Sequence, residues 1–154
     1  MLTTSCHCGA ISLEFARRPR KLTQCNCSIC RRYGAIWAYY RRKSVRVVCL
    51  RNALSVYTWG DKRLQFYRCK NCGSVTHHER AGKRPDGSDW VGINVRNIDD
   101  PESVASLPIK MLDGAATWHI LGEHIQPDLF RSPSAKSNRL ARGPRRSPGG
   151  RRAV

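Results

Sequence analysis

Seven of the chain's eight cysteines stand in three tight groups, and this spacing constrains the fold more than any other feature. The groups are CHC at residues 6–8, CNCSIC at 25–30 and CKNC at 69–72, and Cys49 stands apart in VRVVCL. The opening MLTTSCHCG has none of the charged and apolar regions of an export signal, so we expect a reducing compartment. In that setting closely spaced thiols indicate metal ligation rather than disulfide bonding.

The first and third groups together make a complete ligand set for one zinc ion. Cys69 and Cys72 are separated by two residues and followed by Gly73, the pattern of a zinc knuckle, in which glycine permits a tight turn. Cys6 and Cys8 are separated by one residue and point to the same side of an extended chain. Each pair supplies half of a tetrahedral shell. We therefore expect a structural zinc ion on Cys6, Cys8, Cys69 and Cys72.

The middle group offers only three thiols. A zinc ion with three protein ligands and an exchangeable fourth position is an established catalytic arrangement. We therefore predict a second zinc ion on Cys25, Cys27 and Cys30, with solvent or substrate in the fourth position. Two alternatives stay open, namely a redox cluster without metal and a fourth ligand from elsewhere in the chain. The candidates for that ligand are His7, His77, His78, His119, His124 and Cys49.

Residues that follow the middle group suggest how a substrate would be held. Arg31 and Arg32 come directly after Cys30, and a guanidinium group matches a carboxylate in geometry and charge. Trp37 follows in a run of aromatic residues that can wall a pocket. We predict Arg31, Arg32 and Trp37 as substrate-binding residues. Basic surface and ordinary core packing are the competing explanations of the same three residues.

Isolated cysteine and histidine residues receive structural interpretations. Cys49 lies in an apolar strand pattern, so we expect a buried thiol that belongs to neither metal site. His77 and His78 are neighbours in VTHHER. If that segment is a strand, their side chains point to opposite faces and only one of them can reach a given site.

The segments between the cysteine groups are typical of β-strands. ISLEF at residues 11–15 alternates apolar and polar side chains, as in a half-buried strand. Five further segments are rich in β-branched and aromatic residues: AIWAYY, VRVVCL, LSVYTW, LQFYRC and WVGINV. GDKR between Trp59 and Leu64 predicts a hairpin turn, and DDPES near Asp100 predicts a helix start. The fold class predicted is mainly β, a small zinc-bound antiparallel β domain with a short helix.

Charge separates a body from a tail. The chain carries a net charge of +17, of which residues 131–154 contribute +8, because they hold eight Lys or Arg and no acidic residue. The only large apolar residues of that tail are Leu140 and Val154, so we expect it to be disordered. A basic chain of this kind can bind nucleic acid nonspecifically. No apolar run approaches the length of a membrane span, so we expect a cytoplasmic protein with no membrane partner.

Four segments carry a resemblance to a known family. In order along the chain they are SCHCGAISLEF, QCNCSICRRYGA, YRCKNCGS and VGINVRNIDDPE. They resemble the glutathione-dependent formaldehyde-activating enzyme (GFA) family, also called the centromere protein V domain family. The resemblance implies a zinc domain of the β-tent type over residues 3–127, which leaves the tail at 131–154 outside it. It also implies a structural zinc on the first and third cysteine groups and a second zinc on the middle group.

The resemblance also implies an activity. The family's named reaction joins glutathione to formaldehyde as S-hydroxymethylglutathione, and its class is usually described as carbon–sulfur lyase. The implied reading is therefore a lyase with two zinc ions per chain as cofactors and a small thiol, such as glutathione, as partner. Cys25, Cys27 and Cys30 would be its catalytic ligands, since an open zinc lets an incoming thiol lose its proton more easily.

Two non-catalytic hypotheses stand beside the lyase. The net charge and the arginine-rich tail favour a zinc module that binds nucleic acid or chromatin. The tail has no aromatic residues for base stacking, and no recognition helix is evident, which argues against it. The other hypothesis is a structural or regulatory zinc protein, like the family's fold relatives that bind small GTPases.

Overall fold

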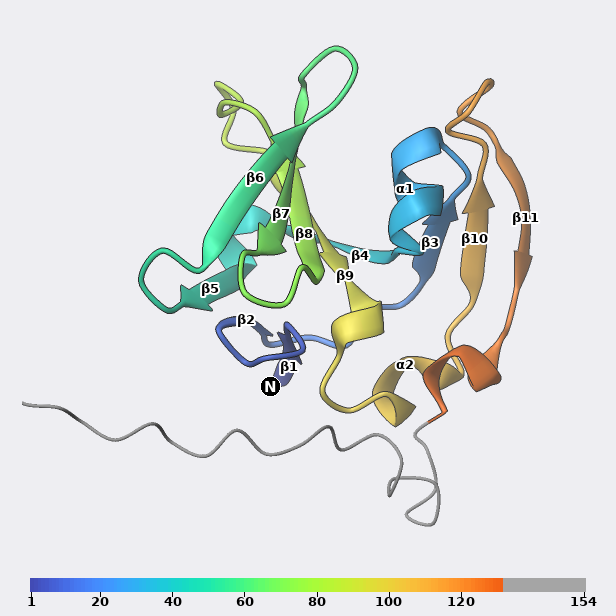
Figure 1. Cartoon of the computed structure of the whole chain (residues 1–154). Coiled ribbons are helices and arrows are strands. Elements are labelled where there is room, and N and C mark those ends of the chain that lie inside the picture. Colours follow the sequence, from blue (N-terminus) through green and yellow to red (C-terminus); the bar gives the residue numbers. More distant parts are fainter. Residues whose placement is uncertain (132–154) are drawn as a thin grey trace, which may run out of the picture.

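The strands of the computed structural model, which describes residues 1–131, form two sheets (Figure 1). The smaller sheet has the order β1-β2-β5, and the larger has the order β11-β10-β3-β4-β9-β8-β7-β6. The strands of the smaller sheet are β1 (Leu2–Ser5), β2 (Ile11–Phe15) and β5 (Val45–Cys49). Those of the larger sheet are β3 (Leu22–Cys25), β4 (Ile36–Arg41), β6 (Leu54–Thr58), β7 (Leu64–Cys69), β8 (Val75–Arg80), β9 (Trp90–Asn94), β10 (Ile109–Leu112) and β11 (Ile120–His124).

Helices are few and short, so the predicted mainly β fold is confirmed. The α-helices are α1 (Ser28–Tyr33) and α2 (Glu102–Ala105), and the 3-10 turns are η1 (Arg42–Ser44), η2 (Val95–Asn97) and η3 (Pro127–Phe130). The predicted short helix is α2, and all six predicted strands are present. No described helix is long and apolar enough to cross a membrane. The predicted disordered tail lies outside the described residues, apart from Arg131.

Two features differ from the prediction. The helix α1 lies inside the middle cysteine group, where the dense cysteine pattern gave no helical signal, and ends at Gly34 with a left-handed φ of 58°. The sheet is also not wholly antiparallel, because β3 and β10 pair in parallel, with Leu22 opposite Ile109. A parallel pair needs a long crossover connection, and here most of the domain provides it.

The larger sheet has two wings. Figure 1 shows β6, β7 and β8 on one side and α1, β3, β10 and β11 on the other, with β4 and β9 running between them. The strand β4 pairs with β3 at Ile36 and Trp37 and with β9 from Trp37 to Arg41. The middle cysteine group lies on the second wing, since Cys25 ends β3 and Cys30 lies in α1.

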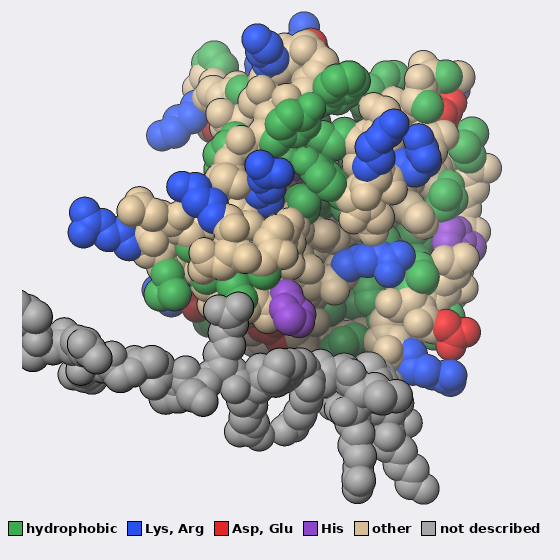
Figure 2. Space-filling model, viewed as in Figure 1, with side chains coloured by type: hydrophobic (Ala, Val, Ile, Leu, Met, Phe, Trp, Pro, Cys, Tyr) green, Lys and Arg blue, Asp and Glu red, His purple; other side chains and the backbone are tan. Residues whose placement is uncertain are grey.

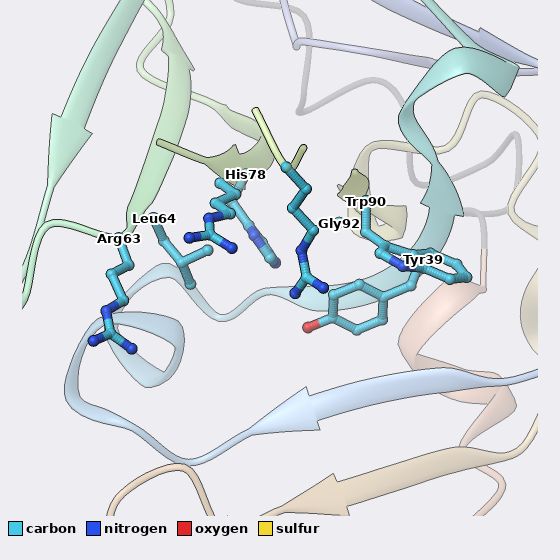
Figure 3. A pocket seen from close by; sticks show the side chains of 8 residues that line it. Tyr39, Arg63, Leu64, His78, Trp90 and Gly92 are labelled. Carbon is cyan, nitrogen blue, oxygen red and sulfur yellow. The ribbon is translucent and has the colours of Figure 1, made fainter. Parts of the chain in front are cut away.

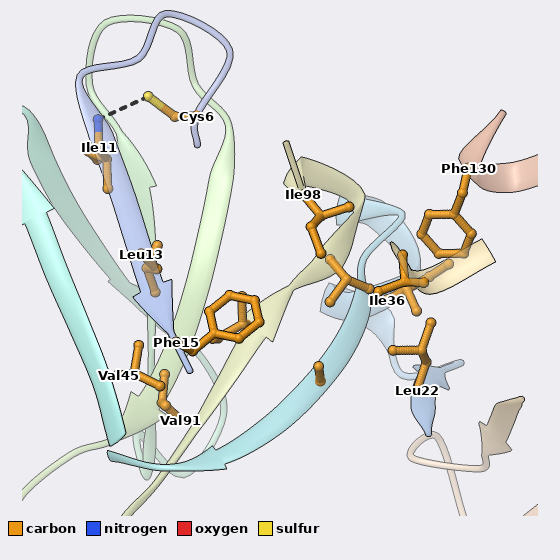
Figure 4. Packing of buried hydrophobic residues seen from close by; sticks show 14 of the residues in the cluster. Cys6, Ile11, Leu13, Phe15, Leu22, Ile36, Val45, Val91, Ile98 and Phe130 are labelled. Atoms are coloured by element: carbon orange, nitrogen blue, oxygen red, sulfur yellow. Dashed lines mark hydrogen bonds between the residues drawn. The ribbon is translucent and has the colours of Figure 1, made fainter. Parts of the chain in front are cut away.

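The main core lies between the small sheet and the centre of the large one (Figure 4). The alternating residues Ile11, Leu13 and Phe15 of β2 are almost completely buried, as the period-two pattern predicts. Burial of each such side chain contributes about 1.5–3 kcal/mol to the free energy of unfolding. The backbone N–H of Ile11 donates a hydrogen bond of 3.2 Å to Cys6 Sγ, which ties the core to the first cysteine group.

Cys49 is exposed, so the prediction of a buried thiol is wrong. The strand β5 pairs only with β2 and forms an edge of the small sheet. Its side chains are buried at Val45 and become more exposed toward Cys49. The pattern of apolar residues gave no sign that this end of the strand has no layer above it.

The two histidines of β8 point to opposite faces, in agreement with the period of a strand. His77 is buried and stacks on Tyr67, with ring centroids 4.4 Å apart and the planes 2° from parallel. Its Nδ1 shares a hydrogen bond of 2.9 Å with Thr76 Oγ1, and its Nε2 lies 3.6 Å from Glu79 Oε1. Glu79 in turn pairs with Arg42 at 2.7 Å. Burial, with the charge of Arg42 second, lowers the pKa of His77 to about 3.

We expect the buried His77 to make the free energy of unfolding decrease as the pH is lowered. Between its unfolded pKa of 6.5 and its folded pKa of about 3 the unfolded chain binds a proton that the native chain does not, so acid favours unfolding. Its contribution to the free energy of unfolding should decrease by about 2 kcal/mol between pH 7.5 and pH 5. Urea unfolding of wild type and His77→Gln at both pH values measures this. The free energy of unfolding of the two proteins should differ less at pH 5 than at pH 7.5. The exposed His119→Gln is the control, and a His77→Gln difference that stays constant contradicts the expectation.

Candidate metal centres and the adjoining cavity

The first and third cysteine groups meet in space. The four sulfur atoms of Cys6, Cys8, Cys69 and Cys72 all lie within 4.8 Å of one another. The Sγ atom of Cys8 lies 3.6 Å from those of Cys6 and Cys69. Four converging thiols are the donor set of a closed tetrahedral metal site. We call these residues the four-cysteine group.

Two glycine turns present these thiols to one another. Gly9 and Gly73 have φ angles of 75° and 77°, a left-handed conformation that glycine adopts without steric cost. The N–H of Gly9 donates to the carbonyl of Cys6 at 2.8 Å, and the N–H of Gly73 donates to that of Cys69 at 2.9 Å. Each turn therefore places both cysteines of its pair on one side. Since the two pairs are more than 60 residues apart in sequence, a bound metal would join the start of the chain to its middle.

The three thiols of Cys25, Cys27 and Cys30 also lie within 4.8 Å of one another and form the three-cysteine group. The end of β3 supplies Cys25, and the helix α1 begins directly after Cys27 and carries Cys30. Protein N–H groups point at the sulfur atoms. Trp37 Nε1 donates to Cys30 Sγ at 3.3 Å, and the backbone N–H of Cys27 donates to Cys25 Sγ at 3.4 Å. Such donors stabilise negative charge on sulfur, which is the form that binds a metal.

The acidities of two of these thiols move in opposite directions. A hydrogen bond from Cys30 lowers the pKa of Cys25 to about 5, with the N–H groups of Cys27 and Gly114 acting in the same sense. The same hydrogen bond, together with burial, raises the pKa of Cys30. The Cys30 thiol therefore donates its proton toward the Cys25 sulfur, which favours negative charge on Cys25 and so favours binding of a cation.

No fourth protein ligand joins the three-cysteine group in the described part of the chain. Among the described residues, no other His, Cys, Asp or Glu ligand atom lies within 4.8 Å of all three thiols. The candidates named from the sequence were His7, His77, His78, His119, His124 and Cys49. Of these, only His78 lines the cavity beside the thiols.

A cavity of about 520 Å³ opens beside the three-cysteine group. It lies between the two wings of the large sheet, where Figure 2 shows hydrophobic side chains gathered at the surface, and it has mostly apolar and aromatic walls. Its lining residues are Cys25, Cys27, Ile29, Cys30, Tyr39, Trp59, Gly60, Asp61, Arg63, Leu64, Phe66, His78, Leu112, Gly114 and Trp118. We call it the cysteine cavity. Cavities of this size with a few polar groups are typical of small-molecule sites.

The predicted substrate-binding residues do not line this cavity. Trp37 is completely buried and contacts the site through Cys30, so it is a supporting residue of the sulfur atoms rather than a wall. Arg31 and Arg32 are exposed on α1, and Arg32 bonds back to the carbonyl of Ser28 at 2.8 Å. The helix α1 turns both arginines toward solvent. Their direction could not be predicted from the sequence, because the helix itself was not predicted. The arginine that lines the cavity is Arg63, from the β6–β7 hairpin.

A loop after β10 closes one side of the cavity. Asn26, the residue between two of the cysteines, donates to Asp113 Oδ1 at 2.9 Å and accepts from the N–H of Ala115 at 2.9 Å. Thr117 donates to Asp113 Oδ2 from both its N–H and its hydroxyl. Hydrogen bonds from Asn26 and then Thr117 lower the pKa of Asp113 to about 2. The loop is therefore fastened to the three-cysteine group and holds Trp118, which has a left-handed φ of 60°, at the cavity.

Gly114 of this loop has no room for a side chain. A Cβ atom at position 114 would overlap the sulfur of Cys25 and press on Cys27 Cβ. Asp113 and Gly114 form a dipeptide that is common in turns, but no local pattern connects residue 114 with residue 25. Only the parallel pairing of β3 with β10, in which Cys25 lies opposite Leu112, brings them together.

Comparison with known proteins agrees with this arrangement. Residues 1–108 match the model of the family described as glutathione-dependent formaldehyde-activating enzyme. The chain belongs to the GFA family. The match contains both cysteine groups of the metal centres, whereas the loop with Gly114 and Trp118 lies beyond it.

One solved structure has a fold comparable to that of this GFA-family chain. It is a Rhodobacter sphaeroides protein that is 32% identical in sequence, with a TM-score of 0.55. The similarity covers 70% of this chain and 98% of the other. A comparison with curated proteins gives no significant match.

We expect the two cysteine groups to differ in their contribution to stability. Cys72→Ser removes a ligand from a closed set that joins distant segments, and structural zinc contributes on the order of 10 kcal/mol to folding. Cys27→Ser removes a ligand beside an open cavity. Thermal unfolding and metal analysis should therefore show Cys72→Ser unfolded or aggregated, and Cys27→Ser folded with one metal ion fewer.

Cys49→Ser is the matched control, because this exposed thiol belongs to neither group. It should keep the melting temperature and metal content of the wild type. Equal destabilisation by Cys27→Ser and Cys72→Ser would contradict the division between the two groups.

Gly114→Ala should disturb the three-cysteine group alone. The added methyl group overlaps Cys25 Sγ, so the loop or the thiol must move and metal held there should be lost during mild chelation. Gly122→Ala in β11 is the control, since nothing lies within 4 Å of its added methyl group. Metal analysis before and after chelation provides the measurement. Full retention of both ions in Gly114→Ala would contradict the observed packing.

Proposed function

We propose that this protein is a zinc-dependent enzyme of the carbon–sulfur lyase type that acts on an adduct of a thiol and an aldehyde, such as S-hydroxymethylglutathione. The observation that carries the proposal is the three-cysteine group, with no fourth protein ligand among the described residues, at the wall of a cavity of substrate size. The family name supports glutathione as the thiol and formaldehyde as the aldehyde.

The donor sets fit zinc at both groups. All seven ligands are thiols, which favour zinc over the hard cations that prefer oxygen. Cys6, Cys8, Cys69 and Cys72 would hold a structural ion, and Cys25, Cys27 and Cys30 would hold the second. Zinc bound at the second group would supply a Lewis acid that lowers the pKa of a substrate thiol.

The protein's own residues would control charge and water at the site. The N–H groups of Trp37 and Cys27 hold negative charge on the ligand sulfurs. Phe66 is buried in the cavity wall, and the exposed rings of Trp59 and Trp118 line the cavity, so a substrate bound against them would displace water and strengthen the attraction between opposite charges. The sulfur atoms therefore present negative charge to a cavity that can admit a substrate.

The reaction needs only a sulfur–carbon bond and one proton. In the direction of synthesis the thiol sulfur bonds to the aldehyde carbon, and the carbonyl oxygen gains the proton that the thiol loses. Tyr39 lines the cavity, and desolvation, with the charges of Cys30 and Cys25 second, raises its pKa. Its hydroxyl therefore stays protonated and can donate a hydrogen bond to the developing oxygen anion. In the reverse direction the same bond breaks and the products are a thiol and an aldehyde.

The alternative of a nucleic-acid module has less support in the described residues. It rests on the basic surface and on the basic tail, and the tail lies outside the described residues beyond Arg131. A cluster of thiols at a cavity with aromatic walls has no function in binding phosphate groups. The lyase proposal also implies a cytoplasmic location, because free thiols persist in a reducing compartment.

X-ray absorption at the zinc edge, with and without glutathione, tests the proposal. Without glutathione, seven cysteine sulfurs are shared by two ions, and a bound thiol should add one sulfur. Exchange spectroscopy by nuclear magnetic resonance should show faster interconversion of glutathione and S-hydroxymethylglutathione than in buffer. Cys27→Ser should lose at least 100-fold in this rate, as for other removed catalytic groups.

Cys49→Ser serves as the control and should retain both responses. An unchanged sulfur count at saturating glutathione, together with an exchange rate equal to that in buffer, would reject the proposal for this thiol.

A further inference from the structure

A second cavity of about 390 Å³ adjoins the cysteine cavity. The two cavities share four lining residues, Tyr39, Arg63, Leu64 and His78. The remaining lining residues of the second cavity are Arg80, Arg84, Trp90 and Gly92. In Figure 3, Arg63 lies on one side and Tyr39 and Trp90 on the other, with the His78 ring between them. We call this the arginine cavity.

Positive charge dominates the arginine cavity. Three guanidinium groups line it, those of Arg63, Arg80 and Arg84, and no acidic side chain is among its described lining residues. Arg63 pairs with Asp61 at 3.2 Å, but both side chains are mostly exposed, so this pair contributes little and is easily exchanged. Arg80 and Arg84 make no ion pair with any described residue. Their charges are therefore available to an anion.

The other walls of the arginine cavity are aromatic and closely packed. The guanidinium of Arg41 stacks on the Trp90 ring at 4.4 Å, which fixes the ring at the edge of the cavity. The His78 ring packs against Gly92 so closely that a Cβ at position 92 would overlap it. His78 is buried, and burial lowers its pKa to about 4, so the ring adds polarity without charge. A rigid, partly aromatic wall with converging guanidinium groups suits a flat anion.

We propose that the arginine cavity binds the carboxylate end of the thiol substrate while its sulfur lies at the three-cysteine group. The two ends are connected through the shared wall of Tyr39, Arg63, Leu64 and His78, so one molecule can occupy both cavities. Arg80 and Arg84 would then determine specificity for thiols that carry a carboxylate several bonds from the sulfur. This inference rests on the proposed function, because it assigns the remote end of the same substrate.

Calorimetric titration of the full-length, zinc-loaded protein tests this subsite without turnover. S-Methylglutathione has the carboxylates of glutathione but no free thiol, and its diethyl ester lacks the carboxylate charges. The wild type should bind the acid at least tenfold more tightly than the ester. The double variant Arg80→Gln with Arg84→Gln should bind the acid at least tenfold more weakly than the wild type.

Arg20→Gln is the matched control, since Arg20 is exposed and lines neither cavity. It should bind like the wild type. The melting temperature and zinc content of the double variant are measured first, to separate loss of the subsite from loss of the fold, and each single variant is titrated as well. Equal affinity of wild type and folded variants for S-methylglutathione overturns the proposal. A second outcome also overturns it. In that outcome the wild type binds a hexamer of single-stranded DNA but not S-methylglutathione, and the variants lose the DNA binding.

Kinetics separate this proposal from the function on which it rests. In the variants the KM for glutathione should rise more than the KM for 2-mercaptoethanol, which carries no carboxylate. Turnover with equal increases in both KM values rejects the arginine subsite and leaves the lyase intact. Arginine-dependent binding of S-methylglutathione without turnover of any thiol supports the subsite and rejects the lyase.

Discussion

The meeting of four thiols from two distant turns is the interaction on which the rest of the structure depends. The Cys6–Cys8 turn belongs to the small sheet, and the Cys69–Cys72 turn ends the β7–β8 hairpin of the large sheet. A metal ion bound at this point would join the sheets where the hydrophobic core begins, at Ile11. A domain of this size has a modest core, so a metal bond between its two sheets can decide whether the domain folds.

The large sheet solves a different problem, because it brings a reactive group and its binding surfaces together from separate wings. Cys25 and Cys30 come from one wing, whereas Arg63 and His78 come from the other. The strand β4 connects the wings and supplies Tyr39 to the cavity and Trp37 to the sulfur atoms. In the proposed function, substrate binding and thiol chemistry would thus be positioned by the same strand. A shift of β4 would alter both at once.

Cysteine spacing and strand periodicity made much of this predictable. The two ligand groups follow from pairs such as Cys69 and Cys72, since short spacings restrict where the thiols can point. Cavity residues were harder to predict, because a cavity depends on tertiary contacts. Arg31 is close to the cysteines in sequence but is turned outward by α1, whereas Arg63 is remote in sequence and close in space. The contact between Gly114 and Cys25 likewise depends on a parallel strand pair that no local pattern encodes.

The parallel pairing of β3 with β10 also orders events during synthesis of the chain. The four-cysteine group is complete once Cys72 has left the ribosome, but Cys25 obtains its partner strand only when Leu112 has emerged. Contacts of such long range form late, since the intervening chain must first be organised. The three thiols at residues 25–30 therefore remain uncovered by the loop after β10 while about 80 further residues are added, at roughly 5–20 residues per second. During these seconds the nascent chain exposes them to oxidants and to competing metal ions.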